Sequence, residues 1–163
     1  QKATVTPEDL TYNNLGLDNM ENIERMKPSQ TYEVMDLWLR TTIHSNSFVE
    51  ENFWETHYDF VKEKYINGKE NFVYIIDGKI VAFTGVTEDN RITGLFVDPE
   101  YQNKGIGTAL INFLKSEYNM LHIPIYARNR KALAFATRTG FIIDGALRHE
   151  HNGEVMYTML WNM

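Results

Sequence analysis

The chain has 163 residues, of which 43% are hydrophobic and 13% aromatic, so it can form one domain with a sizeable core and is too apolar to be disordered. Its net charge of −6 argues against nucleic acid as the main partner and is compatible with a cationic, amine-bearing substrate. The sequence contains no cysteine, which excludes disulfides, thiolate metal sites and cysteine nucleophiles, and no apolar run approaches the ~20 residues of a membrane span. No signal peptide is visible, so a cytoplasmic protein without a membrane partner is expected.

The first part of the chain, residues 1–19, is polar and shows little apolar periodicity. Thr6 followed by Pro7 is typical of a helix start. We expect residues 1–19 to be an extension or tail and residues 20–163 to form the domain.

The region that follows predicts a short strand and two helices. The strand is expected near 22–26. A helix opened by Pro28 runs to about His44, and a second helix runs from about 50 to 65 with aromatic residues at helical spacing. Asn67 and Gly68 end the second helix.

The rest of the chain alternates strands, turns and two further helices. Strands are predicted at 72–76 and 79–86, joined by a hairpin turn at Asp77-Gly78, and then at 91–97, 121–126, 141–148 and 155–161. Helices are predicted from 106 to about 118 and over 129–139, where Gly140 ends the second of them. This order predicts an α/β (α+β) fold: a mixed, mostly antiparallel sheet of about seven strands, with four main helices and a central, right-handed parallel strand–helix–strand crossover.

The loop before the third helix has the layout of an anion site. Residues 95–97 read as a buried strand, which Asp98-Pro99 ends, and the loop closes with Lys104, Gly105 and Gly107. The first N–H groups of a helix have no partner within it, and glycines let a ligand come close to the backbone. A pyrophosphate is therefore the expected guest.

The glycine order distinguishes between the known phosphate loops. A Walker loop requires a lysine after its second glycine, whereas Lys104 precedes both glycines, and the dinucleotide fingerprint requires a third glycine where Leu110 stands. The pattern that remains, Gln102-x-x-Gly105-x-Gly107 after a strand, resembles the acyl-CoA loop of the GNAT family of N-acetyltransferases.

A second motif strengthens this resemblance. Asn129, Ala132, Phe135, Gly140 and Phe141 match the family's N-x-x-A-x-x-F-Y-x-x-x-G-F block at the right spacing. The resemblance covers about residues 22–161 and is most similar to small bacterial acetyltransferases of the YjaB type. It implies the GNAT fold and transfer of an acetyl group from acetyl-CoA, as co-substrate, to a primary amine of a small molecule or protein by direct attack, with no metal.

The resemblance also implies which residues bind the cofactor. They lie at the end of the strand, in the glycine loop and on the following motif: Leu95, Phe96, Val97, Gln102, Asn103, Lys104, Gly105, Ile106, Gly107, Thr108, Asn129, Ala132 and Phe135. Asn129 is also expected to cap its helix.

The proton-transfer groups of the family do not carry over. Ala136 stands where many members have the tyrosine that protonates the leaving thiolate, and the run 91–95 lacks the usual carboxylate base. Tyr126, Tyr157 and Tyr74 are the candidate proton donors, and Tyr126 is preferred because it ends a strand just before Asn129. A backbone N–H near Phe96 or Val97 is expected to stabilise the oxyanion.

Other polar groups have alternative interpretations. His149 and His151 resemble a metal-ligand pair, but no third ligand is evident, and a solvated hairpin is favoured. The segment 44–47 is either part of an acceptor pocket or a capping turn. Basic residues near the second motif either contact the 3′-phosphate of CoA or form a solvated helix face; they are Arg128, Arg130, Lys131 and Arg138.

Three functions compete. An N-acetyltransferase leads, an acyl-CoA-binding sensor or scaffold without turnover is the alternative that Ala136 keeps open, and a nucleotide-binding protein is disfavoured by the glycine order. The sequence identifies neither the acceptor nor the oligomeric state; a monomer is compatible with it, as is a homodimer paired through the last strand near Trp161.

Overall fold

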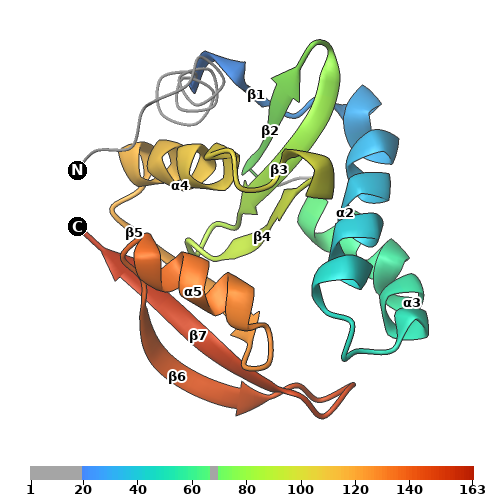
Figure 1. The fold of residues 1–163 in the computed structure, drawn as a ribbon, viewed down its shortest axis with the longest axis vertical. Coiled ribbons are helices and arrows are strands. Elements are labelled where there is room, and N and C mark those ends of the chain that lie inside the picture. The colour runs from blue at the N-terminus through green and yellow to red at the C-terminus, as the bar shows by residue number, and fades with distance from the viewer. Residues whose placement is uncertain (1–19, 67–69) are drawn as a thin grey trace, which may run out of the picture.

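A computed structural model describes residues 20–66 and 70–163 of the chain (Figure 1). The predicted tail, with its helix start at Thr6-Pro7, and the predicted break at Asn67-Gly68 lie outside these residues. The described part follows the predicted order of strands and helices. Its strands are β1 (Ile23–Arg25), β2 (Glu70–Ile76), β3 (Lys79–Val86), β4 (Ile92–Val97), β5 (Met120–Tyr126), β6 (Ile142–Arg148) and β7 (Val155–Asn162). Its longer helices are α2 (Thr31–Ser45), α3 (Glu51–Val61), α4 (Ile106–Glu117) and α5 (Arg130–Arg138).

The strands form two antiparallel sheets. One has the order β1-β2-β3-β4 and the other the order β5-β7-β6. They meet at one parallel bridge between Arg91 and His122, where the backbone N–H of His122 donates to Asn90 at 3.1 Å. Beyond this bridge β4 and β5 diverge, while β5 pairs with β7 along its whole length. The sheet predicted as one mixed unit is thus split at its parallel step.

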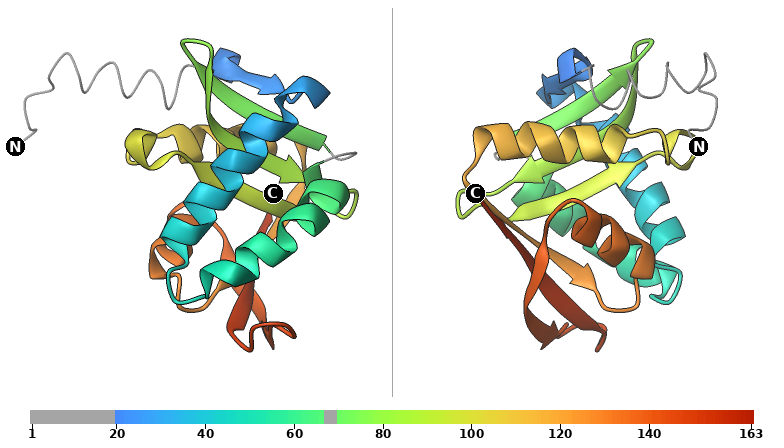
Figure 2. Two further views of the ribbon diagram at one scale, coloured as in Figure 1. Left: turned by 90° about the vertical axis from the view of Figure 1, so that its right-hand side faces the viewer. Right: turned by 60° about the vertical axis from the view of Figure 1, so that its left-hand side comes forward.

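Helices cover both faces of the first sheet. On one face, Val34, Leu37 and Trp38 of α2 pack in a cluster with Val73 and Phe83. On the opposite face, α4 places Ile106, Ala109 and Leu110 in a cluster with Tyr74 and Ala82. Figure 2 shows α2 and α3 on one side of the first sheet and α4 on the other.

The second sheet is covered on one face by α5. Ala136 and the following Phe141 are buried with Leu121, Ile125 and Met159 of the sheet. Strand β6 forms the outer edge and is exposed along its whole length. The sharp end of α5 comes from Gly140, whose φ of +97° is the left-handed conformation predicted for a helix-ending glycine.

Helix boundaries differ from the prediction in two places. A short 3₁₀ turn (Pro28–Gln30) precedes α2, and the predicted long helix over 50–65 consists of α3 followed by a π-helical turn (Lys62–Ile66). Among the residues described, no helix is long and apolar enough to cross a membrane.

Candidate active site

A cleft of about 890 Å³ opens where β4 and β5 diverge. Residues 93–97 of β4 and 123–126 of β5 line its middle. The loop before α4 and the inner face of α5 line one end, and α2, α3 and the β6–β7 hairpin line the other. The split between the two sheets therefore creates a cleft with two ends of different construction.

The glycine loop presents unpaired backbone donors to the cleft. Asn103 and Gly105 have φ values of +62° and +81°, which turn the chain sharply before α4. Ala109 is the first residue of α4 whose N–H donates to the backbone, to Gly105 at 3.0 Å. Within the described ranges, the N–H groups of residues 105–108 have no protein acceptor. This donor set and the helix dipole fit two linked phosphates.

The second glycine of the loop lets two helices approach each other. A Cβ atom built on Gly107 would lie 3.2 Å from the ring of Phe135 and 3.7 Å from Leu95. These three residues all line the cleft. A side chain at residue 107 would therefore require the Phe135 ring to shift by a few tenths of an ångström, so glycine allows the start of α4 and the middle of α5 to approach closely.

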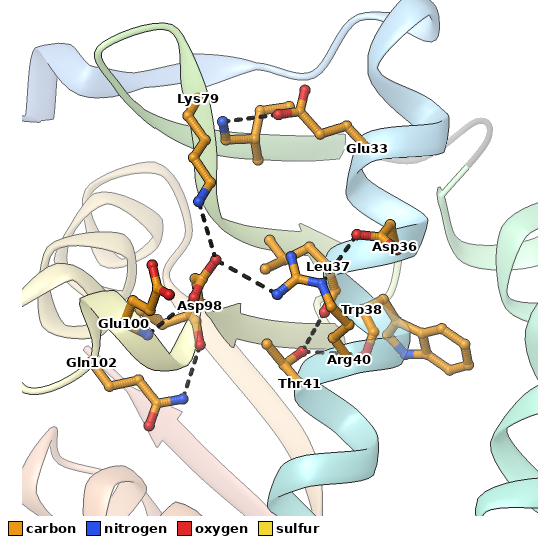
Figure 3. Close-up of polar contacts among 12 residues, drawn as sticks. Glu33, Asp36, Leu37, Trp38, Arg40, Thr41, Lys79, Asp98, Glu100 and Gln102 are labelled. Atoms are coloured by element: carbon orange, nitrogen blue, oxygen red, sulfur yellow. Dashed lines mark hydrogen bonds and ion pairs between the residues drawn. The ribbon is translucent and has the colours of Figure 1, made fainter.

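A buried carboxylate fixes the point where β4 passes into the loop. Asp98 is 3% exposed, its N–H donates to Val81 of β3 at 2.8 Å, and its Oδ1 accepts from the N–H of Glu100 at 3.0 Å. Its Oδ2 lies 3.7 Å from Arg40 Nη1 and 3.8 Å from Lys79 Nζ, as Figure 3 shows. Asp98 thus connects the loop to α2 and to the β2–β3 hairpin.

The polar side chains predicted for the loop play different parts. Gln102 donates through Nε2 to the backbone oxygen of Val97 at 2.9 Å (Figure 3) and accepts from Lys131 Nζ at 3.2 Å, so it ties the loop to β4 and α5. Lys104 does not line the cleft; its Nζ lies 5.4 Å from the centre of the Tyr101 ring. The expected charge of Lys104 is therefore displaced from the cleft wall.

Asn129 caps α5, as predicted. Its Oδ1 accepts from the N–H of Ala132 at 3.1 Å, and its Nδ2 donates to Oδ1 of Asn46, in the turn after α2, at 3.1 Å. Asn129, Ala132 and Phe135 all line the cleft. The turn of residues 44–47 is thereby tied to the strand end that carries Tyr126.

Tyr126 lies at the centre of the cleft, and the other two candidate tyrosines do not line it. Its hydroxyl accepts from Asn152 Nδ2 at 2.7 Å and donates to no acceptor in the part of the chain that the structure describes. Burial raises the pKa of Tyr126 above 10.0, an effect that the Asn152 hydrogen bond partly offsets. Its phenol therefore stays protonated at neutral pH with a hydrogen free to donate.

The far end of the cleft is lined by aromatic rings. The ring of Trp54 lies 6.4 Å from that of Trp38 and 6.0 Å from that of Tyr126, in edge-to-face arrangements, and Phe53 packs at 4.9 Å from Trp54. Exposed Phe60 also lines this end. These side chains form an apolar wall suited to an extended methylene chain.

Three imidazoles meet beside this wall. His57 of α3 stacks on Phe53 at 4.1 Å, and its ring is 5.4 Å from that of His151, which is 5.7 Å from that of His149. Burial, then the facing imidazoles of His151 and His57, lower the pKa of His149 below 6.5. The fold thus supplies a third imidazole that the sequence did not reveal.

The imidazole cluster does not make a metal site by its geometry. Within residues 20–66 and 70–163, no group of three or more His, Cys, Asp or Glu side chains is arranged to hold a metal ion.

The comparisons with known proteins agree with this geometry. A family model described as an acetyltransferase (GNAT) domain matches residues 28–163. This chain belongs to the GNAT family. It is 29% identical over 129 residues to the peptidyl-lysine N-acetyltransferase YiaC of Escherichia coli K12, a match that covers 78% of this chain and 88% of YiaC.

Solved structures of GNAT proteins share the fold. The apo-form of YjaB from Escherichia coli superposes with a TM-score of 0.75 at 18% identity, over 85% of this chain and 95% of YjaB. The PaiA N-acetyltransferase of Thermoplasma acidophilum in complex with coenzyme A gives 0.69 at 15% identity, over 86% of this chain and 98% of PaiA. The predicted GNAT fold and its YjaB-like pattern are confirmed.

As a member of this family, the chain is an acetyl-CoA-dependent N-acetyltransferase. The acyl-CoA-binding module without turnover gains no support from these matches. The residues that the sequence assigned to the cofactor line one continuous cleft, with Lys104 as the exception. The anchoring role of Asp98 and the approach of His57 to His149 were not predicted from the sequence. The Asp98-Pro99 pair, which is typical of a helix start, is the signal that could have indicated the role of Asp98.

Proposed function

We propose that the acceptor is the side-chain amine of a lysine in a protein or peptide. YiaC, which acts on peptidyl-lysine by its name, supports this assignment, and so does the composition of the cleft. Among the described residues that line it, none is Asp or Glu. That absence carries the proposal, because a polyamine or aminoglycoside has several cations to neutralise, whereas lysine has an apolar stem and one amine.

The surface around the acceptor end also suits a peptide. Glu51, Glu55 and Asp59 are exposed on α3, and the chain as a whole carries a net charge of −6. Such a field attracts basic segments without placing a carboxylate inside the cleft. The lysine stem then lies against the aromatic wall of Trp38, Phe53 and Trp54.

The backbone of β4 is oriented to polarise the thioester. The N–H of Asp98 points to β3, and N–H groups alternate between the two edges of a strand, so the N–H of Val97 points toward β5 and the cleft. Gln102 already holds the oxygen of Val97. We assign the Val97 N–H as the donor to the developing oxyanion.

Tyr126 is the proton donor in this proposal. The amine nitrogen attacks the thioester carbon, the carbon–sulfur bond breaks, and the departing thiolate takes the phenol proton. A thiol with a pKa near ~8.5 is a good leaving group, so positioning in the cleft supplies much of the rate and the phenol adds to it. In this proposal the loop amides hold the diphosphate of acetyl-CoA, and Ala132 and Phe135 flank its pantetheine arm.

A peptide panel tests the acceptor. The enzyme and acetyl-CoA are incubated with one lysine peptide in four forms: N-terminus free or blocked, lysine retained or replaced by arginine. Mass spectrometry should find acetylation in both forms that retain lysine and in neither arginine form. Acetylation that requires the free N-terminus, or turnover of spermidine alone, would overturn the lysine assignment. A cytoplasmic, bacterial setting stays a prediction, as do a monomeric or homodimeric state and the absence of nucleic-acid and membrane partners.

A further inference from the structure

The cleft offers few groups that can take a proton from an ammonium. Its described lining contains no carboxylate, and the only imidazoles in that lining are those of His44, His57 and His149. An amine near pKa 10.4 arrives protonated at neutral pH and cannot attack until one proton leaves. One of the three imidazoles is the natural acceptor.

Hydrogen bonds distinguish two of these rings. Nδ1 of His57 lies 2.7 Å from the backbone oxygen of Phe53, so this nitrogen carries the proton and Nε2 carries the lone pair. Nδ1 of His149 instead accepts from the N–H of His151 at 3.2 Å, so neutral His149 carries its proton on Nε2 and is a donor. His57 Nε2 has no partner among the residues described here.

The surroundings of His57 hold its ring in place. It stacks on Phe53 with an angle of 30° between the planes, and Phe53 itself packs on Trp54, which faces Tyr126. The titratable groups facing His57 are His151 at 5.4 Å, whose Nε2 lies 3.3 Å from Oε1 of the exposed Glu150, and His149 behind it. Its side of the cleft is therefore lined by imidazoles and aromatic rings.

We propose that His57 takes the proton of the incoming amine through Nε2, directly or through one water. The nitrogen lone pair that this releases forms the bond to the thioester carbon as the carbon–sulfur bond breaks. The thiolate takes the proton of Tyr126, and the phenolate takes the second proton that the nitrogen loses. The proton on His57 passes to solvent beside His151, so one proton is released per acetyl group transferred.

The pH dependence of turnover tests this role. If a group of the protein takes the amine proton, kcat/KM for the amine rises with pH and then flattens well below the pKa of the amine. If no group takes it, kcat/KM follows the fraction of free amine and keeps rising with pH. His57→Gln should lower kcat/KM about 100-fold near pH 7, lose the flattening, and recover toward the wild-type value near pH 9. Acetyl-CoA affinity, measured by calorimetry, should stay unchanged.

Two further variants complete the experiment. His122→Gln removes an imidazole that lies outside the cleft and should reproduce the wild-type profile. His57→Ala should regain activity when free imidazole is added, which a merely structural role would not produce. A His57→Gln profile that flattens as in the wild type with a loss below about threefold, or no imidazole rescue, would overturn the proposal.

This inference rests on acetyl transfer to a protonated amine and not on the choice of lysine. If the peptide panel fails and spermidine is acetylated, the same profiles are measured with spermidine. Failure of the lysine assignment and failure of His57 as the proton acceptor are thus distinguishable.

Discussion

The two ends of the cleft are built by different means. At the cofactor end, consecutive residues of one loop supply backbone N–H groups, and the conformation of the loop is set by Gly105 and by its anchor Asp98. At the acceptor end, side chains from α2, α3, β5 and the β6–β7 hairpin converge. The difference teaches that the proposed acetyl-CoA site depends mainly on local backbone, whereas the proposed acceptor site depends on side chains that long-range packing brings together.

The largest expected effect is at the cofactor end. Gly105→Glu forces a side chain into a φ of +81°, which costs about 1–2 kcal/mol, and adds a negative charge beside two phosphates. We expect the Kd for acetyl-CoA, measured by calorimetry, to rise at least about 100-fold.

Gly78→Glu is the matched control for that variant. Gly78 has a φ of +78° in the β2–β3 hairpin turn, with nothing near its Cβ position and no place in the cleft lining. The Gly78→Glu substitution should lower the stability of the protein about as much as Gly105→Glu does and leave its affinity for acetyl-CoA unchanged. Equal losses of affinity in both variants would show that strain alone, and not the loop, accounts for the effect.

The next largest effect is expected at Tyr126, in the middle of the cleft. Tyr126→Phe removes the free hydroxyl hydrogen, and because a thiolate leaves readily, we expect kcat at pH 7 to fall about 10-fold with the KM for acetyl-CoA little changed. Steady-state kinetics between pH 6 and 9 measures this. Unchanged turnover over that range would remove Tyr126 from the mechanism.

The anchor of the loop should give a smaller effect. Asp98→Ala removes the acceptor for the N–H of Glu100, worth about 1 kcal/mol, and the partner of Arg40 and Lys79. We expect about a 5-fold rise in the KM for acetyl-CoA with kcat nearly unchanged, and a lower melting temperature.

Asp36→Ala serves as the control for the anchor. Asp36 is an exposed partner of Arg40 at 3.1 Å on α2 and does not reach the loop. Acetyl-CoA kinetics of this variant should match the wild type. An Asp98→Ala enzyme with wild-type acetyl-CoA kinetics would separate the anchor from cofactor binding.

The smallest effect concerns stability at the acceptor end. The pKa of His149 lies below 6.5 in the folded protein, chiefly because of burial, so the unfolded chain binds more protons in the window below 6.5. Stability from this source is present above pH 6.5 and is lost as pH falls through the folded pKa. When the pH is lowered from about 7 to about 5, the melting temperature of the His149→Gln variant should therefore fall less than that of the wild type. Calorimetry at the two pH values measures this difference. An identical loss in both proteins would contradict this.

Local patterns predicted much of the fold and the cofactor end. The order of strands and helices followed from apolar periodicity and from turn residues such as Asp77-Gly78 and Gly140, which act over a few positions. The position of Lys104 was not predictable in this way, since the direction of a long side chain depends on contacts such as that with Tyr101. The end of the helix predicted over 50–65 was not predictable either, because α3 stops at Val61 and a π-helical turn follows it.

What the sequence by itself determined is the family, the glycine loop and the helix cap at Asn129, because each depends on residues within one short segment. Only the tertiary structure decided that Asp98 meets Arg40 and Lys79, and that His57 stands near His149 and His151 beside Tyr126. These side chains are separated by tens of residues along the chain. Their approach depends on the divergence of β4 and β5 and on the packing of α3 against the β6–β7 hairpin, which no local pattern records.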